Sequence, residues 1–233
     1  MTTLLITGGA GFIGSHTCIS LIEFGHQVIV LDDYSNSSPK ALNRIKELLG
    51  TKACKLLKIY RGDIRDKNLL EDIFNSFISK DNPIEAVVHF AGLKAVEQST
   101  QDPLKYWDVN VSGSLCLLEV MSKYKCHTIV FSSSATVYGS AYDKLINEND
   151  EIKPKNPYGH TKVAIETVLN NLFESSPKEW KIANLRYFNP IGAHESGLIG
   201  EDPSGTPNNL FPLICKVAAG KKEKIEIFGR DWP

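Results

Sequence analysis

Short runs of apolar residues alternate along the chain with longer segments in which apolar positions recur at helical spacing. The apolar runs predict strands at 4–7, 27–31, 55–60, 86–90, 128–132 and 182–187. The periodic segments predict helices near 12–24, 39–49, 67–79, 103–124 and 158–174. Because strands with such continuous apolar runs are buried on both faces, this alternation predicts an α/β fold with a doubly wound parallel sheet.

The amino-acid composition changes after residue 188. Residues 189–209 are rich in glycine and proline, which is typical of a long irregular segment with a functional role. A short helix near 208–219 and a strand at 224–228 are expected to follow. We therefore expect one domain at 1–188 and the start of a smaller region at 189–233, which is cut short because its end shows no capping feature.

Four glycines follow the first predicted strand. Gly9, Gly11 and Gly14 fit the pattern G-x-G-x-x-G, and Gly8, Gly11 and Gly14 fit the overlapping pattern G-x-x-G-x-x-G. The pattern lies between a strand and a helix, and Asp32 closes the next strand about 20 residues later, as a dinucleotide site of the Rossmann type requires. The alternative is a glycine-rich turn that binds no ligand.

Asp32 indicates which dinucleotide this turn prefers. A carboxylate at the end of the second strand can accept hydrogen bonds from an adenosine ribose, and it repels a 2′-phosphate. The next residues, 33–36, contain no arginine that would receive such a phosphate. The sequence therefore predicts NAD rather than NADP.

Tyr158 and Lys162 are the strongest candidates for catalysis. Their spacing of four residues at the start of a predicted helix brings both side chains to one helical face. A nearby ammonium favours the phenolate form of a tyrosine, which could then remove a hydroxyl proton as a hydride leaves the same carbon. On an arbitrary helix the same spacing is typical of a solvated surface pair.

Three serines, at 132–134, end the fifth predicted strand. Ligands of open α/β sheets bind at the carboxyl ends of the strands, so one of these serines is expected to reach the substrate and Tyr158. The others fit a polar loop that caps local backbone groups.

Charge and cysteine content exclude several classes of partner. The 26 Lys and Arg against 27 Asp and Glu leave a net charge of -1, so no global field attracts nucleic acid or an anionic membrane. No apolar run is long enough to span a bilayer. The five scattered cysteines fit a reducing cytoplasm better than a disulfide framework.

Together these motifs resemble the extended short-chain dehydrogenase/reductase family. The resemblance runs along the whole chain, and its most specific parts are residues 7–17, 62–65, 89–96, 131–139, 185–190 and 207–210. It implies an NAD site that includes Gly8, Gly11, Phe12, Ile13, Gly14, Asp32, Asn36, Ser37, Asp63, Ile64, Phe90, Ala91, Gly92, Lys94, Asn110, Tyr158, Lys162 and Phe188. In that site Asp63 would accept from an adenine amino group, and Lys94 would reach the nicotinamide ribose or a phosphate.

The resemblance also implies a reaction and a substrate. Tyr158, with Ser134 and Lys162, would support transient oxidation at C4 of a UDP-hexose, and so interconvert UDP-glucose and UDP-galactose in galactose metabolism. The implied substrate contacts are Lys94, Ser134, Tyr158, Asn189, Asn209, Leu210, Ile227 and Phe228. It further implies a homodimer formed through the helices near 103–124 and 158–174.

Several alternatives stay open within this resemblance. Sugar-nucleotide dehydratases of the same fold carry an acidic pair where this chain has Ala135 and Thr136, which disfavours loss of water. A UDP-uronate 4-epimerase, a nucleotide-sensing module and an inactive NAD-binding fragment are the other readings. Since family members continue past residue 233, we expect this chain to bind NAD but to turn over UDP-galactose weakly or not at all. No metal site is expected, because His89 and His194 fit packing and loop roles.

Overall fold

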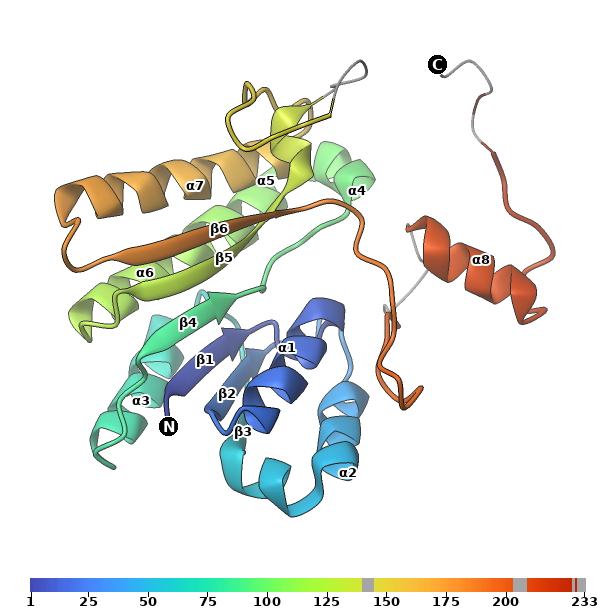
Figure 1. The fold of residues 1–233 in the computed structure, drawn as a ribbon. Helices are drawn as coiled ribbons and strands as arrows, with labels where there is room; N and C mark the ends of the chain where they lie inside the picture. Colours follow the sequence, from blue (N-terminus) through green and yellow to red (C-terminus); the bar gives the residue numbers. More distant parts are fainter. Residues whose placement is uncertain (140–144, 203–208, 228, 230–233) are drawn as a thin grey trace.

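Six parallel strands form one sheet in the computed structural model, which describes residues 1–139, 145–202, 209–227 and 229 (Figure 1). The order β3-β2-β1-β4-β5-β6 is the doubly wound order of the Rossmann fold, so the predicted fold class is confirmed. The direction of winding reverses between β1 and β4. The strands are β1 Thr3–Thr7, β2 Gln27–Asp32, β3 Leu57–Arg61, β4 Ala86–His89, β5 Thr128–Ser134 and β6 Lys181–Tyr187.

Helices cover both faces of this sheet. Within the described part of the chain, none of them is both long and apolar enough to cross a membrane. They are α1 Phe12–Glu23, α2 Pro39–Leu56, α3 Lys67–Ile78, α4 Val96–Gln101, α5 Pro103–Tyr106, α6 Gly113–Lys123, α7 Pro157–Ser175 and α8 Leu210–Ala218, with short turns η1 Trp107–Ser112 and η2 Ala135–Tyr138.

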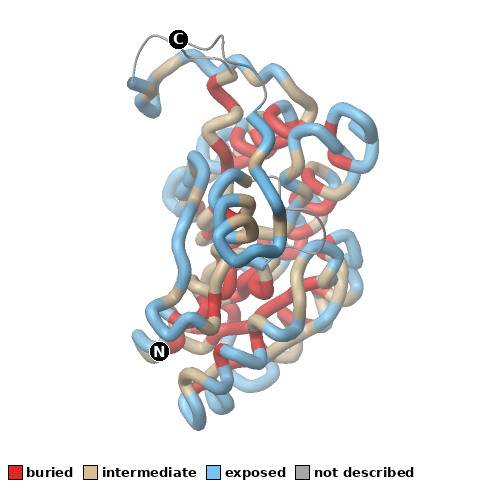
Figure 2. Tube along the Cα trace, turned by 90° about the vertical axis from the view of Figure 1, so that its right-hand side faces the viewer, coloured by how far each residue is buried: buried red, intermediate tan, exposed pale blue. Residues whose placement is uncertain are grey.

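Alternate residues of the central strands enter two separate hydrophobic cores. Leu5, Leu31 and Phe131 point to the core shared with α3, α6 and α7, while Ile6 and Val30 point to the core shared with α1 and α2. The buried interior runs between these layers (Figure 2). Burial on both faces explains why the strands are continuously apolar in sequence.

The predicted helix at 103–124 is wrong in its interior. Residues Trp107–Ser112 form a π-helical turn, η1, between α5 and α6. At its centre, the Asn110 side chain points inward and bonds the backbone of Leu93 and the hydroxyl of Thr161. The wider turn accommodates this inward side chain, and such π-turns are frequent at functional sites.

The second predicted helix also differs from the structure. α2 runs to Leu56 rather than to residue 49, across a kink at Gly50, which has φ of 52°. β3 therefore begins at Leu57, two residues later than predicted. A positive φ is accessible to glycine, so Gly50 permits the chain to bend here and continue as a helix.

The segment after β6 lies against the N-terminal half of the chain as far as residue 202. Ile199 is 3 % exposed and packs in the core of α1 and α2, and Arg44 of α2 donates to the Leu198 carbonyl at 2.6 Å. An antiparallel bridge joins Ala193 to Gly200. These contacts return the irregular segment toward the glycine-rich turn.

The C-terminal helix, α8, lies apart from the sheet (Figure 1). It matches the helix expected near 208–219. The strand expected at 224–228 is wrong for residues 224–227, which are irregular, because no described strand lies beside them to supply hydrogen bonds. Phe228, the last residue of that prediction, lies outside the described residues.

Replacement of Gly14 by alanine is expected to destabilise the fold. The added Cβ would lie 2.3 Å from the Gly8 carbonyl oxygen and 2.8 Å from the Gly9 Cα, so α1 would have to move off the sheet. We expect a loss of about 2–3 kcal/mol in the free energy of unfolding, measured by urea denaturation.

Gly11→Ala is the matched control for that variant. Its Cβ would lie 3.3 Å from the same oxygen, at a backbone conformation that alanine adopts, so stability should change by less than about 1 kcal/mol. Equal losses in the two variants would contradict this account of α1 packing.

Candidate functional site

The glycine-rich turn leaves the N-terminus of α1 open for an anion. Gly8 has φ of +71° and packs so closely on the end of β4 that a Cβ would lie 2.7 Å from the Ala91 nitrogen. Its N–H donates to the Leu31 carbonyl at 2.8 Å, which fixes the turn beside β2. Gly11 caps α1 without a side chain, so the first-turn amides of Phe12 and Ile13 can donate to a phosphate.

Asp32 lies directly beside this turn. Its carboxylate, 6 % exposed, accepts from the Ala10 N–H at 2.9 Å, the Tyr34 N–H at 2.9 Å and the Ser37 hydroxyl at 2.7 Å. These bonds hold the carboxylate at the end of β2, where the sequence predicts a ribose contact. Ser37 thus supports Asp32, while Asn36 is exposed next to it.

Asp63 and Ile64 follow β3 at the same edge of the sheet. The Asp63 carboxylate accepts from the Arg65 N–H at 2.8 Å and from its guanidinium, and that hydrogen bonding holds the pKa of Asp63 below its usual value. Arg65 also pairs with Asp108 of η1. Ile64 belongs to the core, so its side chain supports the loop from behind.

The residues after β4 bring the nucleotide edge close to α7. Gly92 has φ of +153°, and a Cβ there would lie 3.1 Å from Asn110 Oδ1 and 4.0 Å from Lys162 Nζ. Asn110 accepts from the Leu93 N–H at 2.8 Å and donates to its carbonyl at 3.0 Å. The Asn110 side chain also donates to the Thr161 hydroxyl at 3.1 Å, which joins this loop to α7.

Tyr158, Lys162 and Ser134 meet at the carboxyl ends of β4 and β5. Tyr158 is 8 % exposed and Lys162 is 6 % exposed, so the alternative of a solvated surface pair is wrong. Lys162 Nζ lies 5.7 Å from the centre of the Tyr158 ring and donates to the Ser132 carbonyl at 2.7 Å. Ser134 is hydrogen-bonded to the Tyr158 phenol.

The pKa shifts of Tyr158 and Lys162 do not by themselves favour the phenolate form of the tyrosine. Burial raises the pKa of Tyr158, although the hydrogen bond from Ser134 opposes this. Burial lowers the pKa of Lys162 to about 8, and nearby Glu166 opposes that shift. The ammonium bonds to the Ser132 carbonyl, and in the absence of a bound cation the protein alone does not make Tyr158 more acidic.

Each serine of the 132–134 run has its own contact. The Ser132 carbonyl accepts from Lys162, the Ser133 hydroxyl donates to Glu166, and Ser134 bonds Tyr158. The hydroxyl of Ser134 also accepts from the Thr136 hydroxyl at 2.7 Å. The interpretation of one functional serine and two local caps therefore missed the role of Ser133.

His89 is the centre of a buried polar network that the sequence did not indicate. Its Nδ1 lies 2.6 Å from the Thr7 hydroxyl, and its Nε2 lies 2.9 Å from the Ser114 hydroxyl. Because Ser114 donates to the Asn110 carbonyl, Nε2 carries the proton and Nδ1 accepts from Thr7. The interpretation of His89 as a packing residue is confirmed, since it is 1 % exposed, but it also links Thr7 of β1 to Ser114 of α6.

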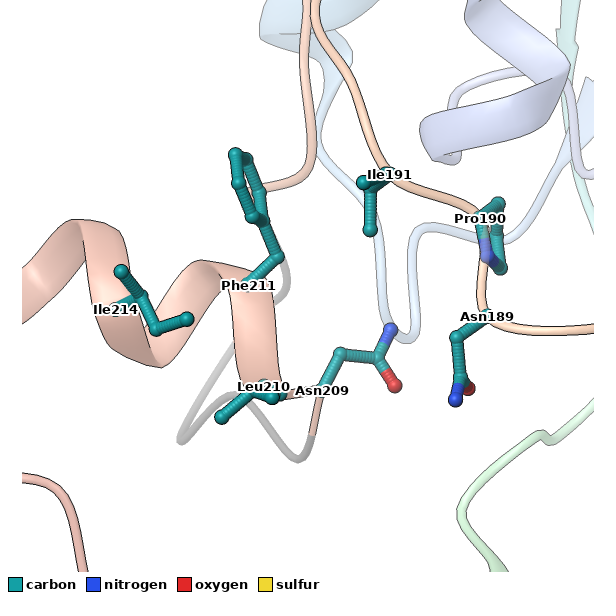
Figure 3. A pocket seen from close by; sticks show the side chains of 7 residues that line it. All are labelled: Asn189, Pro190, Ile191, Asn209, Leu210, Phe211 and Ile214. Carbon is teal, nitrogen blue, oxygen red and sulfur yellow. The ribbon is translucent and has the colours of Figure 1, made fainter.

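A hollow lies between the end of β6 and the start of α8. Asn189 and Asn209 face each other across it, with Leu210 at its edge (Figure 3). Three of the residues expected to contact substrate are thus brought together. Ile227 is 78 % exposed and does not line this hollow, and Phe228 lies outside the described residues.

Glu201 connects the two halves of the candidate site. Its carboxylate lies 3.3 Å from Lys94 Nζ and accepts from the Asn209 side-chain amide at 2.7 Å. Lys94 follows β4, whereas Asn209 begins α8. A residue that the sequence did not single out therefore joins two predicted binding residues.

The described residues contain no group of three or more His, Cys, Asp or Glu side chains that could hold a metal ion. The backbone of Phe90 and Ala91 lies beside the glycine turn, whereas Phe188 is 65 % exposed on leaving β6. The arrangement suits a nucleotide whose phosphates lie at α1 and whose far end reaches Tyr158.

Acid should destabilise the protein through His89. Burial lowers the pKa of His89 to about 3 from 6.5, so below pH 6.5 the unfolded chain binds a proton that the folded chain does not. Stability is therefore lost as the pH falls from 6.5 toward 3, with a slope of about 1.4 kcal/mol per pH unit from this group.

Urea denaturation across this range, compared between the protein and His89→Gln, isolates the effect. The variant lacks the titrating group, so its stability should fall less steeply. The matched control His160→Gln, at an exposed position of α7, should keep the original slope. Identical slopes in all three proteins would contradict a buried neutral His89.

Known proteins resemble the chain along its whole length. A family model described as GDP-mannose 4,6 dehydratase matches residues 5–232. A UDP-glucose 4-epimerase of Bacillus subtilis (strain 168) is 50% identical over 230 residues, which are 99% of this chain and 65% of that protein. The chain thus spans slightly less than two thirds of that relative's length.

Solved structures agree with this match. A UDP-glucose 4-epimerase from Bifidobacterium longum, in complex with NAD+ and UDP, is 47% identical with a TM-score of 0.89, over 99% of this chain and 66% of that one. One from Stenotrophomonas maltophila, with NAD and formylated UDP-arabinopyranose, is 42% identical with a TM-score of 0.91, over 100% of this chain and 66% of that one. The chain belongs to the GDP-mannose 4,6 dehydratase family, and it is similar along its length to UDP-glucose 4-epimerases.

Proposed function

We propose that the chain carries the NAD-dependent part of an epimerase that interconverts UDP-glucose and UDP-galactose at C4 of the sugar. The observation that carries this proposal is the meeting of buried Tyr158, Lys162 and Ser134 at the same sheet edge as the open glycine turn. Similar solved epimerases hold NAD with UDP or a UDP-sugar. Such chemistry belongs to galactose metabolism, and the scattered cysteines favour the cytoplasm.

The described residues fit an NAD molecule at this edge. First-turn amides of α1 would receive the pyrophosphate, and Asp32 would bind the adenosine ribose. Lys94 would bind the nicotinamide ribose or a phosphate. When bound, NAD would accept a hydride from the sugar carbon and return the hydride to the same carbon. The other proposed contacts are Gly8, Phe12, Ile13, Asn36, Ser37, Asp63, Ile64, Phe90, Ala91, Gly92, Asn110 and Phe188.

Tyr158 would take the proton of the sugar 4-hydroxyl and later give it back. Its hydrogen bond with Ser134 orients the phenol oxygen and favours the phenolate, which burial alone disfavours. Lys162 is buried with its Nζ 5.7 Å from the ring centre, where an ammonium would interact favourably with a phenolate. The positive nicotinamide would add a second cation, so we expect Tyr158 to become a base only in the NAD complex.

The nucleotide part of the substrate would lie in the hollow between β6 and α8. Amide groups of Asn189 and Asn209 face each other there, and Leu210 adds an apolar wall. Amides donate and accept, as recognition of a uracil ring or a ribose requires. We therefore propose that 1–188 binds NAD and that substrate contacts begin in 189–233.

The name of the family model raises dehydration as a second reaction. Ala135 and Thr136 argue against it, because neither side chain is an acid or a base at neutral pH. The Thr136 hydroxyl donates to Ser134 in the structure, which is a positioning contact. A UDP-uronate 4-epimerase stays the alternative, and assays with a UDP-hexose and a UDP-uronate distinguish the two activities.

We propose a homodimer that uses α6 and α7. A groove between α3, α6 and α7 is lined by Leu115, Leu118, Val168 and Leu172, with charged residues around it. Leu115, in the first turn of α6, is a large apolar side chain that is 38 % exposed. A second copy related by two-fold symmetry would cover these apolar side chains.

Replacement of Tyr158 by phenylalanine should stop epimerisation while NAD stays bound. Phenylalanine keeps the buried ring but has no proton to exchange, so we expect a roughly 10²–10⁴-fold loss of UDP-galactose conversion. Conversion is followed by coupling the UDP-glucose formed to a dehydrogenase, and NAD binding by calorimetry. The assay uses a chimaera in which this chain replaces the matching segment of the Bacillus subtilis relative.

The 233-residue chain itself is tested in parallel. It should bind NAD more tightly than NADP, and convert UDP-galactose slowly or not at all. Failure of both the chain and the chimaera to bind NAD would refute the proposal, as would full activity of the Tyr158→Phe chimaera. The control Tyr60→Phe removes a hydroxyl from β3, which lies at the opposite edge of the sheet from β6. It should change neither UDP-galactose conversion nor NAD binding.

The dimer is tested by Leu115→Glu. A charge in the groove would have to be buried between two copies, which costs free energy, so the variant should elute as a monomer where the unaltered protein has twice the mass of one chain. Phe24→Glu, at an apolar position that is 83 % exposed outside the groove, should remain dimeric. Light scattering after gel filtration gives the masses. If the unaltered protein is a monomer, the dimer proposal is wrong.

A further inference from the structure

Glu166 extends the Tyr158–Lys162 face of α7 by one more turn. The three residues are spaced by four, so their side chains follow one another along the helix. The Glu166 side chain is only 4 % exposed. A carboxylate buried to that extent is costly unless it is paired and hydrogen-bonded.

Arg186 of β6 supplies the partner. Its Nε donates to Glu166 Oε1 at 3.0 Å, and its Nη2 donates to Oε2 at 2.6 Å, so the pair is bidentate. The Arg186 side chain is 19 % exposed. A planar ion pair of this kind fixes the distance and the rotation between α7 and β6 more strictly than apolar packing does.

The pair also holds the residues on both sides of Ser134. Glu166 accepts from the Ser133 hydroxyl, and Arg186 Nη1 donates to the Tyr138 hydroxyl at 2.7 Å. The guanidinium lies 5.1 Å from the centre of the Tyr138 ring. The end of β5, the turn η2 and the catalytic face of α7 are thus joined through two charged side chains.

Lys162 lies four residues before Glu166 on α7, and its Nζ would lie 4.0 Å from a Cβ at Gly92. In the described part of the chain, the titratable or charged groups near it are Tyr158 and Glu166 on α7 and His89 on β4. His89 is neutral near pH 7, because burial lowers its pKa to about 3. Among these groups, Glu166 is the carboxylate that favours the ammonium form of Lys162.

We propose that Glu166 and Arg186 are a positioning pair for the Tyr158–Lys162 site. The bidentate bond locks α7 onto β5 and β6, and the carboxylate of Glu166 keeps the buried Lys162 ammonium charged. Arg186 donates to both oxygens of the buried Glu166 carboxylate, so this carboxylate is paired and hydrogen-bonded. The inference rests on the proposed function for its catalytic meaning, but its physical content concerns this chain without substrate.

Glu166→Gln tests the pair in the chain as it exists. Glutamine keeps the size and a hydrogen bond with Ser133 but removes the charge, so the Lys162 pKa should fall by roughly one pH unit below that of the unaltered protein. The pKa is read from the pH dependence of the ¹³Cε shift of labelled lysines. The Lys162 signal is assigned by its loss in Lys162→Arg. Glu174→Gln, at an exposed position of the same helix, should leave it unchanged.

The double variant Glu166→Gln/Arg186→Met covers the case in which the single variant does not fold. It removes both charges together, so no unpaired guanidinium remains, and the Lys162 pKa should still be lowered. An unchanged Lys162 pKa in a folded variant overturns the proposal, even if stability falls. Because NAD and UDP-hexose are absent from this measurement, a failure of the proposed function shows separately, as a lack of NAD binding by the unaltered protein.

Discussion

The close contact between Gly8 and the backbone at Phe90–Ala91 is the constraint on which the site depends. A Cβ at Gly8 would lie 2.7 Å from the Ala91 nitrogen, so a side chain there would push β4 away from the glycine turn. With glycine, the end of β1 stays beside the end of β4, where the strand order reverses. The N-terminal end of α1 and the loop 92–94 consequently border one edge, which is the place where open α/β sheets bind ligands.

Burial decides the charges along the rest of that edge. Burial lowers the pKa of His89 to about 3, and it lowers the pKa of Lys162 to about 8, a shift that nearby Glu166 opposes. Tyr158 is made less acidic by burial. The protein alone therefore presents a phenol whose pKa is raised, and under the proposed function a cationic cofactor would supply the positive charge that favours the phenolate.

Much of this arrangement follows from local sequence, and the rest depends on contacts distant along the chain. The glycine turn, Asp32 and the Tyr158–Lys162 spacing were predictable because each has a fixed pattern over a few residues. The π-turn at Asn110 was not, because it is caused by bonds to Leu93 and Thr161. Pairing of Glu166 with Arg186 was missed because 20 residues separate partners that meet only when β6 joins the sheet.

A crystal structure of this chain grown with NAD tests the central claim most directly. The account predicts the pyrophosphate at the first-turn amides of α1, a ribose on Asp32, and the nicotinamide ring between the loop 92–94 and Tyr158. It also predicts that Lys162 keeps its place beside the Tyr158 ring. NAD bound at another part of the surface, or a nicotinamide ring turned away from Tyr158, would contradict it.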